Sequence, residues 1–130
     1  MKKLFVSVPM KGRTETEIRE SISKMKQIAE IYEGEELELI DSYIEHNPPQ
    51  NSNQAIWYLG ESLKKLSKAD VFIGIENSWD WNGCDIEQRV ATSYGIKQHH
   101  VVTESVIPNY RELMRAKYDA MEKTCSPCPF

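Results

Sequence analysis

Two carboxylates, Asp85 and Glu87, follow Gly83 at the predicted start of a helix in the segment KADVFIGIENSWDWNGCDIEQRVATSYG. The segment opens with an apolar strand and passes through a polar loop before it enters that helix. In an open α/β sheet, ligands bind at the carboxyl ends of the strands, where this loop and helix start would lie. A helix N-terminus favours negative charge, so we expect a glutamate in its first turns to stay ionised. Such a carboxylate, with tryptophans beside it, suits attack on a sugar carbon next to a stacked base.

Only one of the two carboxylates can face the floor of such a crevice. Residues two apart on a helix point about 200° away from each other. Glu87 lies at the edge of the apolar stripe and four residues before the small Ala91. We therefore expect Glu87 to point inward and Asp85 outward; the alternative is that Glu87 is an ordinary solvent-facing residue. Asp80, in the preceding loop, could protonate a leaving base if its pKa were raised.

Aromatic side chains in the loop before this helix offer a surface for a planar group. Trp79 and Trp81 are set among polar residues and precede Asn82 and Gly83. Two tryptophans in a polar loop suit either stacking on a base or covering a subunit interface. We take Trp79, Trp81, Asn82 and Gly83 as candidate substrate-binding residues, with the interface as the alternative.

A second candidate loop follows the first predicted strand. It carries two cations, Lys11 and Arg13, just before a helix that starts near Thr14. Side-chain cations and the free N–H groups of a helix N-terminus together make an anion site. The alternative is a solvated turn with two surface cations. The candidate ligand-binding residues of this loop are Ser7, Pro9, Met10, Lys11, Gly12 and Arg13.

The elements that would position these residues alternate between strands and helices. Predicted strands cover residues 3–8, 37–42, 70–75 and 98–103, and predicted helices cover 14–33, 54–68, 83–94 and 109–122. This alternation predicts a single-domain α/β fold, a flavodoxin-like or Rossmann-like parallel sheet with helices on both faces. We expect the strand order 2-1-3-4, a domain over residues 1–124 and a tail over 125–130. The predicted core includes Leu4, Val6, Val71, Ile73 and Val101.

Composition narrows the class of protein. The chain has 130 residues and a net charge of −4, without a run of lysines, which argues against a nucleic-acid polymer as partner. No apolar run approaches the roughly 20 residues that a membrane span needs. The basic start with its short apolar run, ending at Pro9, reads as a first strand, so we expect a cytoplasmic protein. Cys125 and Cys128 form a lone C-x-x-C pair, and we expect no metal and no cofactor.

Two motifs resemble the nucleoside 2-deoxyribosyltransferase superfamily, including its uncharacterised, often phage-borne relatives. The first is the strand and turn VSVPMKG, and the second runs from ADVFIGIE through NGCDIE to QRVATSYGI. The resemblance covers about residues 3–103. It implies a parallel-sheet fold, oligomers with sites near subunit interfaces, and cleavage or exchange at the N-glycosidic bond of nucleosides or their 5′-monophosphates.

By this resemblance Glu87 corresponds to the family's nucleophile. The loop with Lys11, Gly12 and Arg13 resembles the corresponding loop in the branch of the family that recognises monophosphates. The family often has a tyrosine in strand one that contacts the nucleophile, whereas this chain has Phe5. The leading expectation is therefore a hydrolase or transferase for nucleosides or nucleotides. The alternatives are a nucleotide-binding protein without catalysis, with a sequestering or sensing role, and a structural oligomer with a vestigial crevice.

Large aromatic residues also bear on assembly. The second predicted helix and the loop before the third carry more large aromatic side chains than a small monomer needs there: Trp57, Tyr58, Trp79 and Trp81. Exposed apolar patches usually mark partner surfaces, so we expect a homodimer or a larger closed oligomer.

Overall fold

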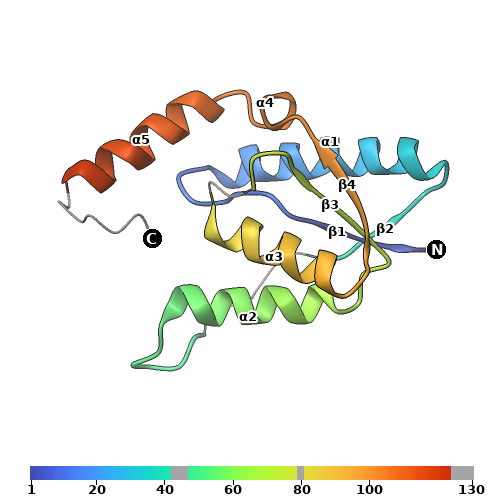
Figure 1. Ribbon diagram of the computed structural model, residues 1–130, viewed down its shortest axis with the longest axis horizontal. Coiled ribbons are helices and arrows are strands. Elements are labelled where there is room, and N and C mark those ends of the chain that lie inside the picture. Colours follow the sequence, from blue (N-terminus) through green and yellow to red (C-terminus); the bar gives the residue numbers. More distant parts are fainter. Residues whose placement is uncertain (42–46, 79–80, 124–130) are drawn as a thin grey trace.

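A parallel sheet lies between two layers of helices in the computed structural model, which describes residues 1–41, 47–78 and 81–123 (Figure 1). The elements follow the chain as β1 (Lys3–Val6), α1 (Glu15–Glu33), β2 (Glu38–Leu39), α2 (Gln54–Leu66), β3 (Val71–Ile75), α3 (Asn82–Ser93), β4 (Lys97–Val101), α4 (Thr103–Val106) and α5 (Tyr110–Lys123). The strand order is β2-β1-β3-β4 and all pairs are parallel, which confirms the predicted fold class and order.

The central strand β3 is buried along its whole length. Such a continuous apolar run is typical of a parallel strand covered on both faces. Side chains alternate between the two faces of the sheet. Val71 and Ile73 join the larger core beneath α1, whereas Phe72 packs on the other face with Phe5, at 6.0 Å between ring centroids. Each predicted core residue is buried: Leu4, Val6, Val71, Ile73 and Val101.

Helix α1 covers one face, and its ends are those the sequence predicts. Thr14 and Glu17 form a reciprocal capping box, in which each side chain bonds the other residue's backbone N–H. Gly34 ends the helix in the left-handed conformation, at φ 70°. The apolar spacing in this helix predicts that Ile18, Ile22, Met25, Ala29 and Tyr32 face the core. Tyr32 does not, because it is 60% exposed and stacks on His99 at the sheet edge.

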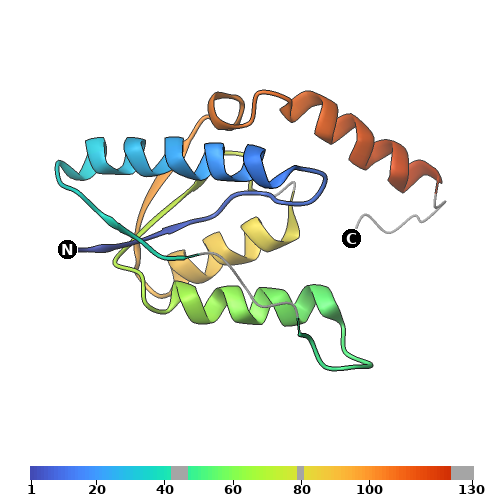
Figure 2. The same ribbon diagram turned by 180° about the vertical axis from the view of Figure 1, so that it is seen from behind.

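Helices α2 and α3 cover the opposite face, and the reverse view shows the same two layers (Figure 2). The apolar spacing of Ile56, Leu59, Leu63 and Leu66 in α2 predicts that all four point inward, but this is wrong for Ile56, whose side chain is 66% exposed. The first turns of α2 extend past the carboxyl edge of the sheet, so the strands cannot cover them (Figure 1). Leu66, at the other end of α2, is fully buried.

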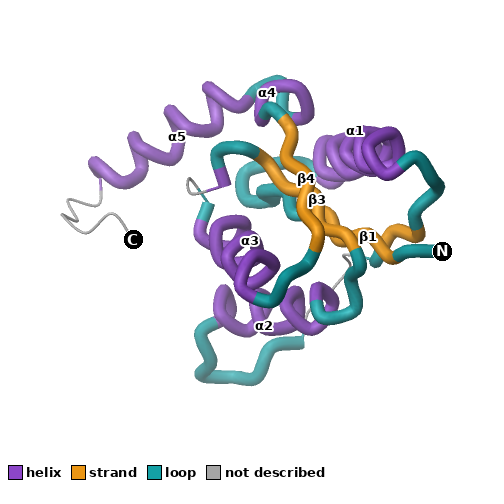
Figure 3. Tube along the Cα trace, turned by 45° about the vertical axis from the view of Figure 1, so that its right-hand side comes forward, coloured by secondary structure: helices purple, strands orange, loops and turns teal. Residues whose placement is uncertain are grey.

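The later elements differ from the prediction in detail. The fourth strand ends at Val101, two residues before its predicted end, and Thr103 instead begins the short helix α4. The second strand shortens to Glu38–Leu39, both exposed at the sheet edge. The first turns of α5 pack on the core through Tyr110 and Leu113, and the rest of the helix extends away from the other elements (Figure 3). Among the described residues, none of the helices has the length and apolar character to cross a bilayer.

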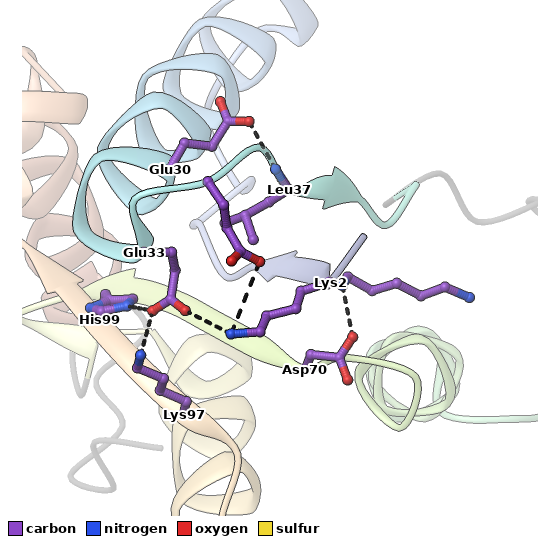
Figure 4. A network of polar contacts seen from close by, with 9 residues as sticks. Lys2, Glu30, Glu33, Leu37, Asp70, Lys97 and His99 are labelled. Carbon is purple, nitrogen blue, oxygen red and sulfur yellow. Dashed lines mark hydrogen bonds and ion pairs between the residues drawn. The ribbon is translucent and has the colours of Figure 1, made fainter.

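Charged side chains fasten the amino edge of the sheet to the end of α1 (Figure 4). Glu33 is the centre of this network, and its side chain is 1% exposed. It meets Lys97 at 2.9 Å, His99 at 2.5 Å and Lys2 at 3.5 Å. At the same edge, Asp70 accepts a hydrogen bond from the Lys3 backbone N–H at 2.8 Å.

Candidate functional site

Glu87 is on the buried side of α3, at the carboxyl edge of the sheet. Its side chain is 8% exposed, and it shares the buried face of α3 with Cys84 and Ala91. The spacing of these three residues, at i, i+3 and i+7, places them on one side of the helix. The predicted inward direction of Glu87 is confirmed, and the ordinary solvent-facing alternative is wrong.

Two serine hydroxyls hold the two oxygens of this carboxylate. Ser7, directly after β1, donates to Oε1 at 2.8 Å, and this bond is buried. Ser62, on α2, donates to Oε2 at 2.5 Å, and this bond is part-buried. Three elements thus converge on Glu87. Ser7 is among the residues predicted from the sequence, whereas Ser62 is not, because one serine in an amphipathic helix carries no distinguishing pattern.

Burial sets the electrostatics of the site. It raises the pKa of Glu87 above its usual value, and the hydrogen bonds from Ser62 and Ser7 counteract part of that rise. A helix N-terminus would lower the pKa of Glu87, but desolvation has the larger effect here and raises it. Burial, and then the charge of Glu87, raise the pKa of the Cys84 thiol to about 12, so this thiol is neutral at pH 7. The ion pairs found among the described residues do not include Glu87.

The neighbours of Glu87 on α3 fix the helix in place. Asp85 turns outward and pairs with Arg89 at 3.1 Å, as predicted for the outer carboxylate. Gln88 accepts a hydrogen bond from the buried Ser78, which follows β3. Consecutive residues of α3 are therefore bonded to residues that follow β1 and β3, and this limits the freedom of Glu87.

Side chains of the loop after β1 point toward opposite faces of the sheet. Ser7 reaches Glu87, whereas Arg13 turns toward α1 and donates to the carbonyl oxygens of Pro9 and Glu17 and to Ser21 Oγ, at 3.1, 3.2 and 2.5 Å. Arg13 is thus bonded within the chain, and the ligand contact of Arg13 with Lys11 stays a prediction. Backbone carbonyls and a hydroxyl already occupy the terminal nitrogens of its guanidinium, while Lys11 is exposed.

A shallow depression of about 220 Å³ lies on the α1 side, lined by Arg13, Ser21, Asn109 and neighbouring side chains. It is on the other face of the sheet from Glu87. Gly12 forms part of the same loop at φ 78°, and a Cβ atom there would lie 3.5 Å from Leu113 of α5. Met10 is 46% exposed and Pro9 is buried.

Trp81 packs on α5. Its ring lies 5.6 Å from that of Tyr110, and the Lys117 ammonium lies 6.0 Å from its centroid. The half-buried Trp81 ring therefore makes its contacts within the chain. Asn82 and Gly83 are exposed at the start of α3. Trp79 and Asp80 lie outside the described residues, as do Cys125 and Cys128.

Within the described ranges, no three His, Cys, Asp or Glu side chains lie close enough together to hold a metal ion. Comparisons with models of protein families, with curated proteins and with solved structures found no match for this chain. The class that the fold and site define is therefore an α/β protein with a serine-bound, buried glutamate at the carboxyl edge of a parallel sheet.

Proposed function

We propose that this chain cleaves or exchanges the N-glycosidic bond of a nucleoside or nucleoside 5′-monophosphate, with Glu87 as the nucleophile. The observation that carries the proposal is the buried Glu87 carboxylate, held by Ser7 and Ser62 at the edge where parallel sheets bind ligands. A buried carboxylate that is oriented by hydroxyl groups is suited to face a carbon that becomes positively charged in the transition state.

In the proposed reaction, an oxygen of Glu87 forms a bond to the anomeric carbon while the bond from that carbon to the base nitrogen breaks. The electron pair of the broken bond leaves with the base, which takes up a proton. Asp80 is the proposed donor of that proton. Water or a second base then attacks the anomeric carbon of the ester and gives up a proton to the Asp80 carboxylate. The bond from the carbon to Glu87 breaks, the Glu87 carboxylate is released, and the configuration is retained.

Hydroxyl groups near the nucleophile also bear on the proposal. The resemblance implies a tyrosine in strand one, but Phe5 stacks on Phe72 and has no hydroxyl. Ser7 and Ser62 supply hydroxyl donors to the carboxylate. Donors to a carboxylate stabilise its ionised, nucleophilic form. The two serines can therefore serve the purpose that the family's tyrosine hydroxyl would serve.

The Lys11 side chain is the proposed contact for a 5′-phosphate, because it is exposed in the loop that begins at Ser7. Lys11→Ala should weaken binding of a nucleoside monophosphate about tenfold, since a charge-assisted hydrogen bond is lost. Binding of the unphosphorylated nucleoside should be unchanged. Lys68→Ala, at the opposite edge of the sheet, is the matched control. Calorimetric titration measures both variants; equal affinity of Lys11→Ala and wild type for the monophosphate would rule out this contact.

A nucleotide-binding protein without catalysis is the second candidate. It is favoured by the burial of Glu87, which raises its pKa and so reduces the anionic fraction. Incubation with deoxynucleosides and their monophosphates, with free base read by chromatography and binding by calorimetry, separates the two. Base release supports the enzyme, and binding without release supports the second candidate.

A further inference from the structure

Ser62 on α2 makes a hydrogen bond to a side chain of another helix. Its side chain is half-buried, and its hydroxyl crosses to α3 to reach Glu87 Oε2. The Ser67 hydroxyl, by contrast, donates to the backbone carbonyl oxygen of Lys64 in the same helix segment. The Ser62 hydroxyl therefore bonds a side chain on another element rather than a carbonyl on its own helix.

The two oxygens of Glu87 differ in their surroundings. The bond from Ser7 to Oε1 is buried, whereas the bond from Ser62 to Oε2 is part-buried. Oε2 is thus on the side of the half-buried Ser62, and Oε1 is on the side of the buried Ser7. A carboxylate oxygen has about two acceptor sites, so Oε2 can accept from Ser62 and still present a lone pair to a ligand.

Glutamate needs such a constraint because the torsion at the end of its side chain is broad and roughly two-fold. One hydrogen bond would leave the carboxylate free to swing about that contact. Two donors, on the β1 end and on α2, fix both oxygens. The other titratable group that contacts the site is Cys84, which is neutral, and among the described residues no cation pairs with Glu87.

We propose that Ser62 is a positioning residue that presents Oε2 of Glu87 to the ligand. The inference rests on the proposed function of Glu87 but concerns a different residue and a separate measurement. It assigns the inner oxygen, Oε1, to anchoring by Ser7 and the outer oxygen to the reaction.

The test compares Ser62→Ala with the matched control Ser67→Ala by titrating the Glu87 carboxyl carbon by NMR. The Glu87 signal is assigned by its loss in Glu87→Gln. Removal of one donor to an ionised group should raise the pKa of Glu87 by about one unit in Ser62→Ala, and Ser67→Ala should leave it unchanged. Alanine is a strong helix former, so both variants should fold.

The activity measurement follows on the same variants. Where wild type releases base, Ser62→Ala should lower kcat about tenfold or more and move the acid limb of its pH profile upward. An unchanged titration of Glu87 in Ser62→Ala overturns the role of Ser62, whether or not base is released. A shifted titration together with a wild type that releases no base supports the positioning role and contradicts the proposed enzyme.

Discussion

The hydroxyl of Ser7 donates to Oε1 of Glu87 over 2.8 Å, across 80 positions of the chain. Ser7 follows β1 and Glu87 lies on α3, so this bond joins a strand end to the helix that covers it. Because it is buried, it holds the carboxylate at the carboxyl edge of the sheet. The proposed chemistry depends on this placement, and the following predictions test the fold and the site separately.

Gly74 tests the packing beneath α3. A Cβ atom at this position would lie 2.9 Å from the ring of Phe72, so this fully buried ring would have to shift within the core. Gly74→Ala should therefore lower the free energy of unfolding by about 1–3 kcal/mol. Gly60→Ala is the control: the same added atom meets nothing within 4 Å, and alanine in a helix should raise the free energy of unfolding by about 0.5–1 kcal/mol. Urea unfolding measures both, and equal effects would contradict the packing described.

Glu33 should make the stability depend on pH. Hydrogen bonds from Lys97 and then His99 lower the pKa of Glu33 to about 2. A carboxyl whose pKa is lower in the folded than in the unfolded chain stabilises the fold above its ordinary pKa. This contribution should be lost as the pH falls from about 4.5 toward 2. Glu33→Gln should unfold more easily at neutral pH and show a weaker loss of stability over that acid range.

Thermal unfolding at several pH values measures this effect, with the exposed Glu36→Gln as control. Glu36→Gln should follow the wild-type curve. If Glu33→Gln runs parallel to wild type from neutral pH to acid, the network in Figure 4 does not stabilise the fold in the way described.

Assembly is the third prediction. Ile56 is 66% exposed, next to Trp57 and Tyr58, whose rings meet at 5.0 Å. We expect this part of α2 to contact a second copy of the chain, because exposed apolar groups of this size mark partner surfaces. Light scattering at micromolar concentration should give a dimer or larger mass for wild type, and Ile56→Asp should shift it toward the monomer. A monomer mass for wild type would contradict the prediction.

Most of the fold could be predicted from local signals in the sequence. The apolar run of β3, the capping box at Thr14 and the left-handed Gly34 each depend on a few neighbouring residues. The direction of Glu87 could be predicted from its position beside the apolar stripe of α3. These signals are local, so they do not require knowledge of the packed structure.

The remaining features depend on how elements meet. Ser62 bonds Glu87 because α2 packs beside α3, and no pattern within α2 indicates which serine does so. Arg13 turns toward α1 because carbonyl oxygens and Ser21 are available there, which its place in a basic loop does not indicate. Ile56 fits the apolar period of α2, but its side chain is 66% exposed.

The central claim is that Glu87 is the nucleophile, and base release by Glu87→Gln tests it most directly. Glutamine has nearly the same size, so folding should be retained, but it cannot act as an anionic nucleophile. Asp85→Asn, two residues away and facing outward, is the matched control. With deoxynucleosides and their 5′-monophosphates as substrates, we predict that wild type and Asp85→Asn release free base, and that Glu87→Gln releases it at least a thousandfold more slowly. Undiminished base release by Glu87→Gln would contradict the assignment.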